Sequence, residues 1–169
     1  NYDLANAKLM KRNDAFYLIV TAYLNKSDIV KTYQSESVVG IDMGVATHVT
    51  KSNGEKISVM IGETDRLKRL QRKFSKQIKG SNNRYKTKGL ISKEYSKITS
   101  KKNDAANKLV HDLLQSELVV LQDENLAGWR TKDSLARGSR AVQYSIMGRV
   151  KAKLKQSDRV IMLRKNAAT

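Results

Sequence analysis

Apolar and polar positions divide the chain into a β-rich start and a longer part in which strands and helices alternate. Residues 4–12 and 16–24 are rich in β-branched and aromatic side chains, which predicts two strands. Arg12-Asn13-Asp14 between them has the composition of a turn, so we expect a β-hairpin. The polar stretch 25–37 is predicted to be a linker, which makes the hairpin the end of a preceding domain.

Three further strands are expected between residues 38 and 61. Residues 38–44 form an apolar run that carries one carboxylate, Asp42, and residues 45–50 continue as a second strand. Ser52-Asn53-Gly54-Glu55 is a hairpin turn of the Asn-Gly type, and residues 56–61 form the third strand. Short turns join antiparallel neighbours, so this part predicts a three-stranded meander.

The period of the apolar positions then changes to that of a helix. Leu67, Leu70, Phe74 and Ile78 recur at helical spacing and predict one helix over residues 63–77. Residues 79–89 contain Gly and Asn among basic residues and are expected to form a loop. A long helix is predicted over residues 92–115, and its apolar seam consists of Tyr95, Ile98, Ala105, Ala106, Leu109 and Leu113.

The last third predicts two strands separated by a basic loop and a helix. The continuous apolar run 118–121 is typical of a strand buried on both faces. Residues 128–138 form a basic loop that holds the only tryptophan, Trp129. A helix is expected over residues 139–155 and a final strand over residues 159–163. The helix has one apolar row, which is Val142, Ile146, Val150 and Leu154.

This order of elements predicts an α/β fold with a mixed sheet and flanking helices. Three antiparallel strands come first, and the remaining strands are reached through helices. That succession is the pattern of a ribonuclease H-like fold, although the order of elements alone is a weak signal.

Composition narrows the class of protein. The chain has 169 residues, of which 40% are hydrophobic, which is enough for a core. Cysteine is absent, which excludes disulfides, thiol catalysis and a Cys-based zinc site within this stretch. No apolar run approaches the ~18 residues that span a bilayer, and no signal peptide is present, so a cytoplasmic protein is expected. Because residue 1 is not Met and the end follows an apolar stretch, the chain is interpreted as a fragment.

The charge indicates an anionic partner. Lys and Arg total 33 against 16 Asp and Glu, a formal net charge of +17. Residues 66–102 hold fourteen basic side chains and one acidic one, and residues 130–165 hold eleven against two. Nucleic acid is the usual partner of such a surface, since neutralised phosphates release counterions. A merely solvated surface is the plain alternative. A membrane-surface role is disfavoured because only Phe74 supplies a bulky aromatic.

Two carboxylates that end apolar strands are candidate metal ligands. Asp42 lies between Gly40 and Gly44 in the first apolar strand, and Glu124 follows the strand 118–121. If the two strands pair, the acids face each other, and hard oxygen ligands favour Mg²⁺ or Mn²⁺. A turn-forming role for Asp42 and a solvated role for Glu124 stay open. Asp123 competes with Glu124, because neighbours in an extended strand point to opposite faces.

The two histidines of the chain are interpreted without a catalytic role. His48 and His111 are the only ones, and each is expected to be a surface residue of a strand or helix.

Several separate motifs, in order, resemble the TnpB family of RNA-guided nucleases, which insertion sequences encode and which are related to type V CRISPR effectors. Gly40-Ile41-Asp42-Met43-Gly44-Val45, followed by Ser52 to Ile57, resembles the first RuvC motif of that family. Residues 67–73 and 79–84 are similar to its basic segment, and residues 119–126 resemble its second motif, an apolar strand followed by an acidic segment. Residues 142–154 are similar to a helix of the family.

The resemblance implies a fold, a domain division and a metal site. It implies a ribonuclease H-like (RuvC) nuclease domain over residues 38–169, preceded in residues 1–37 by the end of a wedge-type β domain and a linker. It selects Glu124 over Asp123, so that Asp42 and Glu124 would be the catalytic and metal-binding acids for two Mg²⁺ or Mn²⁺ ions. A third acid and a zinc ribbon would follow beyond residue 169, so this fragment alone is expected to cut poorly.

The resemblance also implies nucleic-acid partners, a guide RNA and a target DNA, in a bacterial or archaeal, nucleoid-associated protein. The expected function is RNA-guided, metal-dependent DNA cleavage, and the alternative is a nuclease-inactive RNA-guided DNA-binding protein that blocks transcription. Trp129 could stack on a base or cap the core, and these two readings stay equal. The candidate nucleic-acid-binding residues are Arg66, Lys68, Arg69, Arg72, Lys73, Lys76, Lys79, Arg84, Lys86, Lys88, Trp129, Arg130, Arg137, Arg140, Gln143, Arg149 and Lys151.

Overall fold

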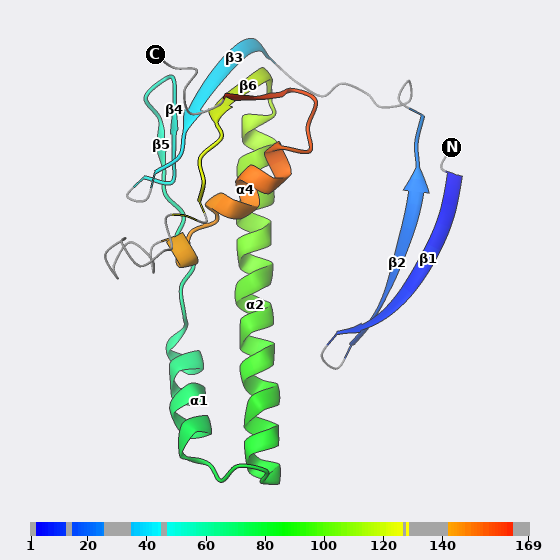
Figure 1. Ribbon diagram of the computed structural model, residues 1–169, viewed down its shortest axis with the longest axis vertical. Coiled ribbons are helices and arrows are strands. Elements are labelled where there is room, and N and C mark those ends of the chain that lie inside the picture. Colours follow the sequence, from blue (N-terminus) through cyan, green and yellow to red (C-terminus); the bar gives the residue numbers. More distant parts are fainter. Residues whose placement is uncertain are drawn as a thin grey trace. The chain divides into compact units, whose positions relative to one another are not determined.

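A computed structural model describes residues 3–12, 15–25, 35–44, 47–126, 128 and 142–163. The chain divides into two compact units, and Figure 1 labels their helices and strands. Unit 1 consists of residues 1–32 and 65–95, and unit 2 consists of residues 33–64 and 96–169. The helix that contains residues 95 and 96 is continuous, so both units share it. No helix within the described residues is long and apolar enough to cross a membrane.

The first element of unit 1 is the predicted hairpin. Strand β1 (Asp3–Arg12) pairs antiparallel with β2 (Ala15–Tyr23), with Lys8 opposite Ile19. The turn residues Asn13 and Asp14 lie outside the described residues. A bulge between Leu4 and Asn6 shifts the register near the open end of the hairpin. The β-branched and aromatic side chains of the pair suit a pleated surface, and the strand prediction is confirmed.

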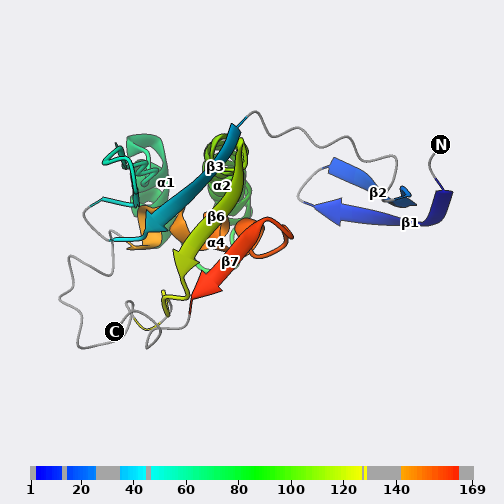
Figure 2. The ribbon, with the colours of Figure 1, turned by 90° about the horizontal axis from the view of Figure 1, so that it is seen from above.

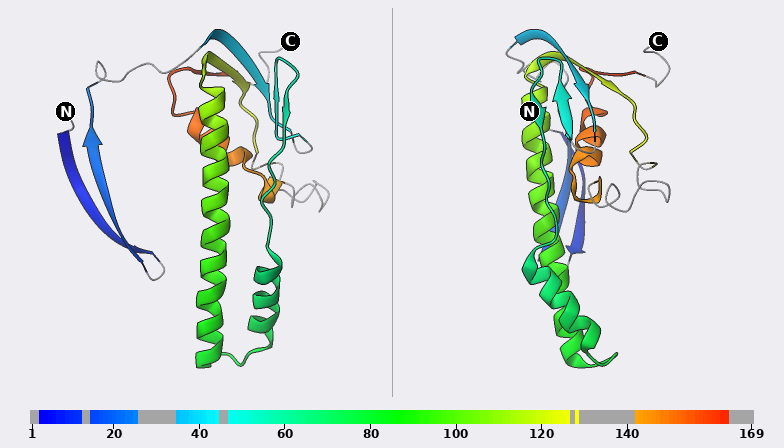
Figure 3. Two further views of the ribbon diagram at one scale, coloured as in Figure 1. Left: turned by 180° about the vertical axis from the view of Figure 1, so that it is seen from behind. Right: turned by 90° about the vertical axis from the view of Figure 1, so that its left-hand side faces the viewer.

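Unit 1 also contains a pair of helices, α1 (Asp65–Lys76) and the first part of α2 (Asn82–Leu113), which run side by side (Figure 3). The predicted first helix is confirmed, and Leu67 on its apolar row is fully buried. Ile78, the last residue of that row, does not share the burial of Leu67, since 81% of its surface is exposed. It lies past the end of α1, so helical spacing no longer governs where it points.

The prediction of a loop over residues 79–89 is wrong for residues 82–89, because α2 begins at Asn82. The turn is confined to the residues around Gly80, whose φ of 85° is in the left-handed region that favours glycine. Ser81 then caps the helix, since its Oγ accepts a hydrogen bond from the Arg84 backbone N–H at 3.2 Å. Asn and Gly within residues 82–89 were interpreted as loop signals, but packing against α1 overrides their low helix propensity.

Unit 2 is built on a five-stranded mixed sheet (Figure 2). Its strands are β3 (Ser35–Asp42), β4 (Val49–Lys51), β5 (Lys56–Ile57), β6 (Ser116–Gln122) and β7 (Val160–Leu163), in the spatial order β5-β4-β3-β6-β7. The first three strands pair antiparallel as the predicted meander, whereas β6 pairs parallel with both β3 and β7. The α/β class and the mixed sheet are thereby confirmed.

The meander strands are shorter than expected. The second strand begins only at Val49 and the third ends at Ile57, while β3 begins at Ser35, within the predicted linker. Residues 26–34 of that linker lie outside the described residues. The Asn-Gly turn is confirmed: Gly54 has a φ of 87°, and the Glu55 N–H donates to the Asn53 side chain at 3.0 Å.

One face of the sheet carries the core of unit 2. Ile41, Val119 and Leu121 pack there against the second half of α2 and against α4 (Met147–Leu154). Leu121 and Leu154 are at most 1% exposed, and burying one such side chain contributes roughly 1.5–3 kcal/mol. Strand β6 is fully buried on this face alone, since Leu118 and Val120 on the other face are half-buried. The prediction of burial on both faces is therefore wrong.

The predicted helix 139–155 is also interrupted. Residues 142–144 are helical, but Ser145 forms a β-bridge with Met60, and α4 begins only at Met147. The Ile61 N–H donates to the Tyr144 carbonyl at 3.0 Å, so the segment after β5 takes the backbone partners that a continuous helix would use. Ile146, Val150 and Leu154 are buried as expected, whereas Val142 is half-buried.

Strand β4 is tied to the end of α2 by a lysine. Lys51 Nζ lies 2.7 Å from Asp112 Oδ2 and 2.9 Å from Glu55 Oε2, and only 12% of its side chain is exposed. Burial acts against the positive charge, but the hydrogen bonds to Asp112 and Glu55 outweigh it and raise the pKa of Lys51. The ion pair therefore fixes the meander against the helix beside the end of β3.

Candidate functional site

The two candidate acids follow the same point of two neighbouring parallel strands. Ile41 of β3 is the register partner of Leu121 of β6. Asp42 comes directly after Ile41 and ends β3, and Glu124 comes two residues after the end of β6 at Gln122. The carboxyl ends of adjacent parallel strands lie about 4.8 Å apart at one edge of the sheet, which is where α/β proteins place ligands. The predicted strand pairing is confirmed.

Asp42 lies on the face of the sheet opposite the core. It alternates with the buried Ile41 and is itself exposed. A shallow depression surrounds it, lined also by Gly40, Thr50, Ser52, Gln122 and Leu163. Ser52 Oγ accepts a hydrogen bond from the Gly40 N–H at 3.2 Å, which fixes the strand just before Asp42. Within the described residues no hydrogen bond or ion pair engages the Asp42 carboxylate.

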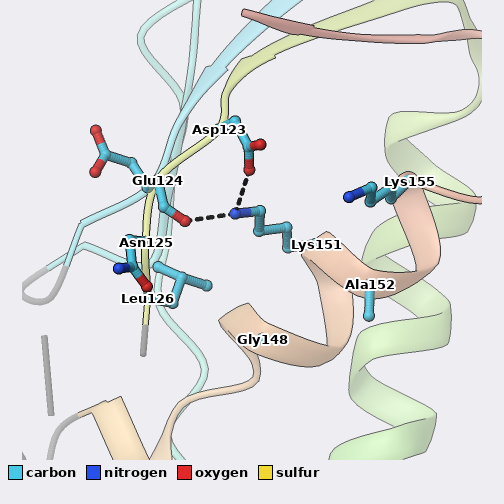
Figure 4. A pocket seen from close by; sticks show the side chains of 8 residues that line it. All are labelled: Asp123, Glu124, Asn125, Leu126, Gly148, Lys151, Ala152 and Lys155. Carbon is cyan, nitrogen blue, oxygen red and sulfur yellow. Dashed lines mark hydrogen bonds and ion pairs between the residues drawn. The ribbon is translucent and has the colours of Figure 1, made fainter. Parts of the chain in front are cut away.

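The structure separates Asp123 from Glu124 (Figure 4). The Asp123 carboxylate binds Lys151 Nζ at 2.6 Å, and this hydrogen bond and charge hold the pKa of Asp123 below its usual range. The Glu124 carboxylate points away from Lys151, on the opposite side of the strand. Among the described residues it has no ion pair or hydrogen bond either. Asp123 is thus paired with the ammonium group of Lys151, whereas the Glu124 carboxylate is available to bind a cation from solution.

The two acids suit a divalent cation but supply only part of a ligand set. Two uncommitted carboxylates at one sheet edge are hard donors of the kind that Mg²⁺ and Mn²⁺ prefer. No group of three acidic, histidine or cysteine side chains close enough to hold a metal occurs in the described part of the chain. Asp42 and Glu124 also line separate depressions. A complete site therefore needs further donors beyond these two residues.

The helix pair of unit 1 carries most of the candidate phosphate-binding residues. Arg66 lies 3.3 Å from Glu94 Oε1 and Lys68 lies 3.5 Å from Asp65 Oδ1, so each already has an acidic neighbour. The remaining candidates of α1, of the turn and of the start of α2 are Arg69, Arg72, Lys73, Lys76, Lys79, Lys86 and Lys88. All seven are exposed, as a surface that contacts a nucleic-acid backbone requires.

Arg84 differs from the other candidates because its guanidinium is bound within the protein. Its Nη1 donates to the backbone carbonyls of Phe74 at 2.7 Å and Gln77 at 2.8 Å, and its guanidinium carbon lies 3.9 Å from the centre of the Phe74 ring. Phe74 lies in the last turn of α1 and Gln77 directly follows its end at Lys76, where helix carbonyls lack the usual amide donor one turn further on. The Phe74 carbonyl also accepts from the Gln77 N–H at 3.3 Å. Arg84 thus caps α1, and a phosphate would have to compete with these contacts. Its nucleic-acid role stays a prediction.

The candidates near α4 have mixed surroundings. The exposed Gln143 accepts a hydrogen bond on its carbonyl from Lys102 Nζ at 2.7 Å. Burial, together with the nearby charge of Arg149, lowers the pKa of Lys102. Lys151 is held by Asp123, as described above. Trp129, Arg130, Arg137 and Arg140 lie outside the described residues.

The prediction that His48 is a surface residue is wrong. His48 is 1% exposed, and its Nδ1 accepts a hydrogen bond from the Val59 N–H at 2.9 Å. Burial lowers its pKa, so the neutral ring is favoured. The histidine therefore joins the loop before β4 to the segment after β5.

Two contacts made by lysines of unit 2 had no signal in the sequence. Lys151 was a candidate for phosphate binding only because it is basic, and its contact with Asp123 depends on how α4 packs against β6. Lys102 was one of many lysines in a basic helix, and its contact with residue 143 joins positions 41 residues apart. Such pairs follow from tertiary packing and leave no local pattern.

Comparison with known protein families assigns the chain to a family. Residues 21–123 match OrfB_IS605, a family described as "Probable transposase". The chain belongs to this family. The matched stretch contains Asp42 and ends at Asp123, directly before Glu124. The resemblance to the TnpB family is thereby confirmed.

Two curated relatives match part of the chain. A protein of Streptomyces pristinaespiralis named "Putative RNA-guided DNA endonuclease" is 34% identical over 105 residues, which are 60% of this chain and 26% of the relative. A protein of Escherichia coli (strain K12) named "Putative RNA-guided DNA endonuclease InsQ" is 33% identical over 95 residues, 54% of this chain and 24% of that relative. The matched stretch thus spans about a quarter of each relative.

Proposed function

We propose that the chain is the nuclease-domain part of an RNA-guided DNA endonuclease that hydrolyses phosphodiester bonds in a RuvC-like, metal-dependent site. The names of the two relatives support guide RNA and target DNA as the partners. The strand order, with an antiparallel meander followed by parallel strands reached through helices, supports the ribonuclease H-like form of the fold.

One observation carries the proposal. The parallel register of Ile41 with Leu121 brings the end of β3 and the end of β6 to the same edge of the sheet. Asp42 and Glu124 are far apart in the sequence, and each presents a carboxylate that no described side chain engages. A basic protein that leaves two acids without a cation partner at one sheet edge is suited to bind a cation there.

The residues of the proposed site would bind metal ions, contact a phosphate or hold the strands in place. Asp42 and Glu124 would hold two Mg²⁺ or Mn²⁺ ions together with a third acid from outside residues 1–169. When bound, such ions supply an activated water and stabilise charge on the leaving oxygen of a phosphodiester. Thr50 and Gln122 line the depression around Asp42 and offer a hydroxyl and an amide to a phosphate. Lys51 and Ser52 hold the neighbouring strands and keep the end of β3 in place.

Nucleic acid would bind mainly through its backbone. The exposed lysines of α1 and α2 would contact phosphates through a compact ammonium charge, and the exposed arginines through a planar guanidinium that can bind two phosphate oxygens. Such contacts do not read the base sequence. Base pairing with a guide RNA would supply the specificity, as in other RNA-guided systems. The seven exposed candidates from Arg69 to Lys88 are therefore expected to determine affinity and its salt dependence.

The test uses a longer protein that contains this chain, with its guide RNA. Asp42→Ala and Glu124→Gln should each reduce DNA cleavage at least a hundredfold while guided DNA binding survives. Glu117→Gln, at the other end of β6, is the matched control and should cut normally. Cleavage retained by Asp42→Ala would remove Asp42 from the site. A wild-type protein that binds the guided target but never cuts, with either metal, would instead support the transcription-blocking alternative.

A further inference from the structure

We infer that Lys151 is a positioning residue: it holds the segment after β6 so that Glu124 faces the side of Asp42. This inference rests on the proposed metal-binding role of Glu124. It assigns Lys151 a task within the protein in place of a contact with phosphate. Asp123 becomes the anchor of this arrangement and is not itself a metal ligand.

The position of Lys151 is set by the core. Met147, Val150 and Leu154 of α4 are at most 1% exposed, so the helix cannot rotate without losing this burial. Lys151 follows Val150 and lies on the neighbouring face of the helix, with 18% of its side chain exposed. On that face Gly148, Lys151, Ala152 and Lys155 follow one another at helical spacing and line a depression together with residues 123–126.

Lys151 makes two contacts with consecutive residues of the segment. Its Nζ lies 2.6 Å from Asp123 Oδ1 and also donates to the Glu124 backbone carbonyl (Figure 4). Because the Lys151 ammonium binds both the Asp123 carboxylate and the Glu124 carbonyl, it fixes the Asp123 side chain and the peptide plane that follows Glu124. The direction of the Glu124 side chain follows from that peptide plane.

The backbone around Glu124 is held at several further points. The Asp123 N–H donates to the Leu163 carbonyl at 2.8 Å, which extends the pairing with β7 by one residue. The Glu124 N–H donates to the Gln122 carbonyl at 2.9 Å, and the Glu124 carbonyl accepts from the Leu126 N–H at 3.0 Å. Lys151 adds a charged donor to that same carbonyl. This contact joins the turn to the packed helix α4.

The arrangement explains why two adjacent acids have different roles. A flexible segment after a strand could turn either Asp123 or Glu124 toward the edge where β3 ends. With Lys151 on the α4 side, Asp123 is drawn there and Glu124 is left on the other side. Groups that orient a metal ligand change metal affinity by roughly 10- to 100-fold when they are removed.

The experiment measures Mn²⁺ binding to the longer protein that contains this chain, by calorimetry and by electron paramagnetic resonance. Lys151→Met should weaken Mn²⁺ binding about tenfold, whereas Lys155→Met, on the same face of α4, should change it less than about twofold. Lys151→Arg retains a charged donor and should restore most of the affinity. Asp123→Asn removes the ion pair but no ligand, so it should weaken binding no more than Lys151→Met does.

A second readout needs no metal. The Leu126 amide donates to the carbonyl that Lys151 also binds, so its hydrogen exchange should be several-fold faster in Lys151→Met than in the wild type, and unchanged in Lys155→Met. Unchanged exchange would overturn the inference, and so would a loss of affinity that is larger in Asp123→Asn than in Lys151→Met. A wild-type longer protein that binds no Mn²⁺ would instead refute the proposed metal site, and the exchange rates would still show whether Lys151 holds the segment.

Discussion

Ile41 and Leu121 are paired across the parallel strands β3 and β6, and each stands one residue before the end of its strand. This pair determines what the following residues can do. Asp42 comes next on one strand, and the segment with Glu124 follows on the other. Because parallel strands end at the same edge, the strand ends that precede these two acids, more than eighty residues apart in the sequence, lie side by side in the sheet.

Asp42→Asn, made in the longer protein that contains this chain, is expected to remove the stabilisation by Mn²⁺. A ligand that binds only the folded state stabilises it by about 2.7 kcal/mol at a hundred times its Kd. The wild-type melting temperature should therefore rise with Mn²⁺, and that of Asp42→Asn should not. Glu117→Gln, which removes a carboxylate from the other end of β6, should respond like the wild type. A rise of equal size in Asp42→Asn would show that any ion binds elsewhere.

Removing one exposed lysine from the helix pair is expected to change how nucleic-acid binding depends on salt. Lys76→Ala or Lys88→Ala removes one phosphate contact, so the slope of log K against log salt should fall in magnitude by about 0.9 for duplex DNA. The stability of the chain should stay within about 0.5 kcal/mol, as is usual for surface substitutions. Fluorescence anisotropy with a labelled duplex at several salt concentrations measures the slope. An unchanged slope would exclude the lysine from the interface.

Arg84→Met is expected to act mainly on stability. The substitution keeps the apolar stem but removes the donors to the Phe74 and Gln77 carbonyls and the contact with the Phe74 ring. The loss should be about 1–2 kcal/mol, measured by urea denaturation. The salt dependence of nucleic-acid binding should change less than in Lys88→Ala. A variant of normal stability with a reduced salt slope would assign Arg84 to phosphate binding instead.

His48 is expected to make the fold less stable in mild acid. Burial lowers its folded pKa, while in the unfolded chain it has the ordinary value of about 6.5. Its contribution to stability is therefore fully present above pH ~6.5 and is lost as the pH falls below that value, because the unfolded state takes up the proton first. Urea midpoints should fall between pH 7.5 and pH 5.5 in the wild type.

The matching variant is His48→Gln, which keeps a polar side chain that does not titrate. It should flatten this part of the pH profile, even if its stability is lower at every pH. A profile as steep as that of the wild type would show that another group titrates in this range.

Local patterns in the sequence were sufficient for most elements of the fold. The β-branched hairpin, the Asn-Gly turn, the helix around Leu67 and the final strand all follow from side-chain periodicity and turn chemistry, which act over a few residues. The errors occur where distant segments compete for the same backbone groups. The bridge of Met60 with Ser145 ends a predicted helix, and packing against α1 extends α2 through residues that resemble a loop.

The candidate acids show the same division. The sequence by itself determined that Asp42 and Glu124 end apolar strands, and the family resemblance singled out these two residues. Only the tertiary structure decided that the strands pair in parallel with Ile41 beside Leu121, and that Lys151 engages Asp123 and leaves Glu124 without a partner among the described residues. The reason is physical: strand and turn preferences arise within a few residues, whereas register and ion pairs depend on how buried faces fit together.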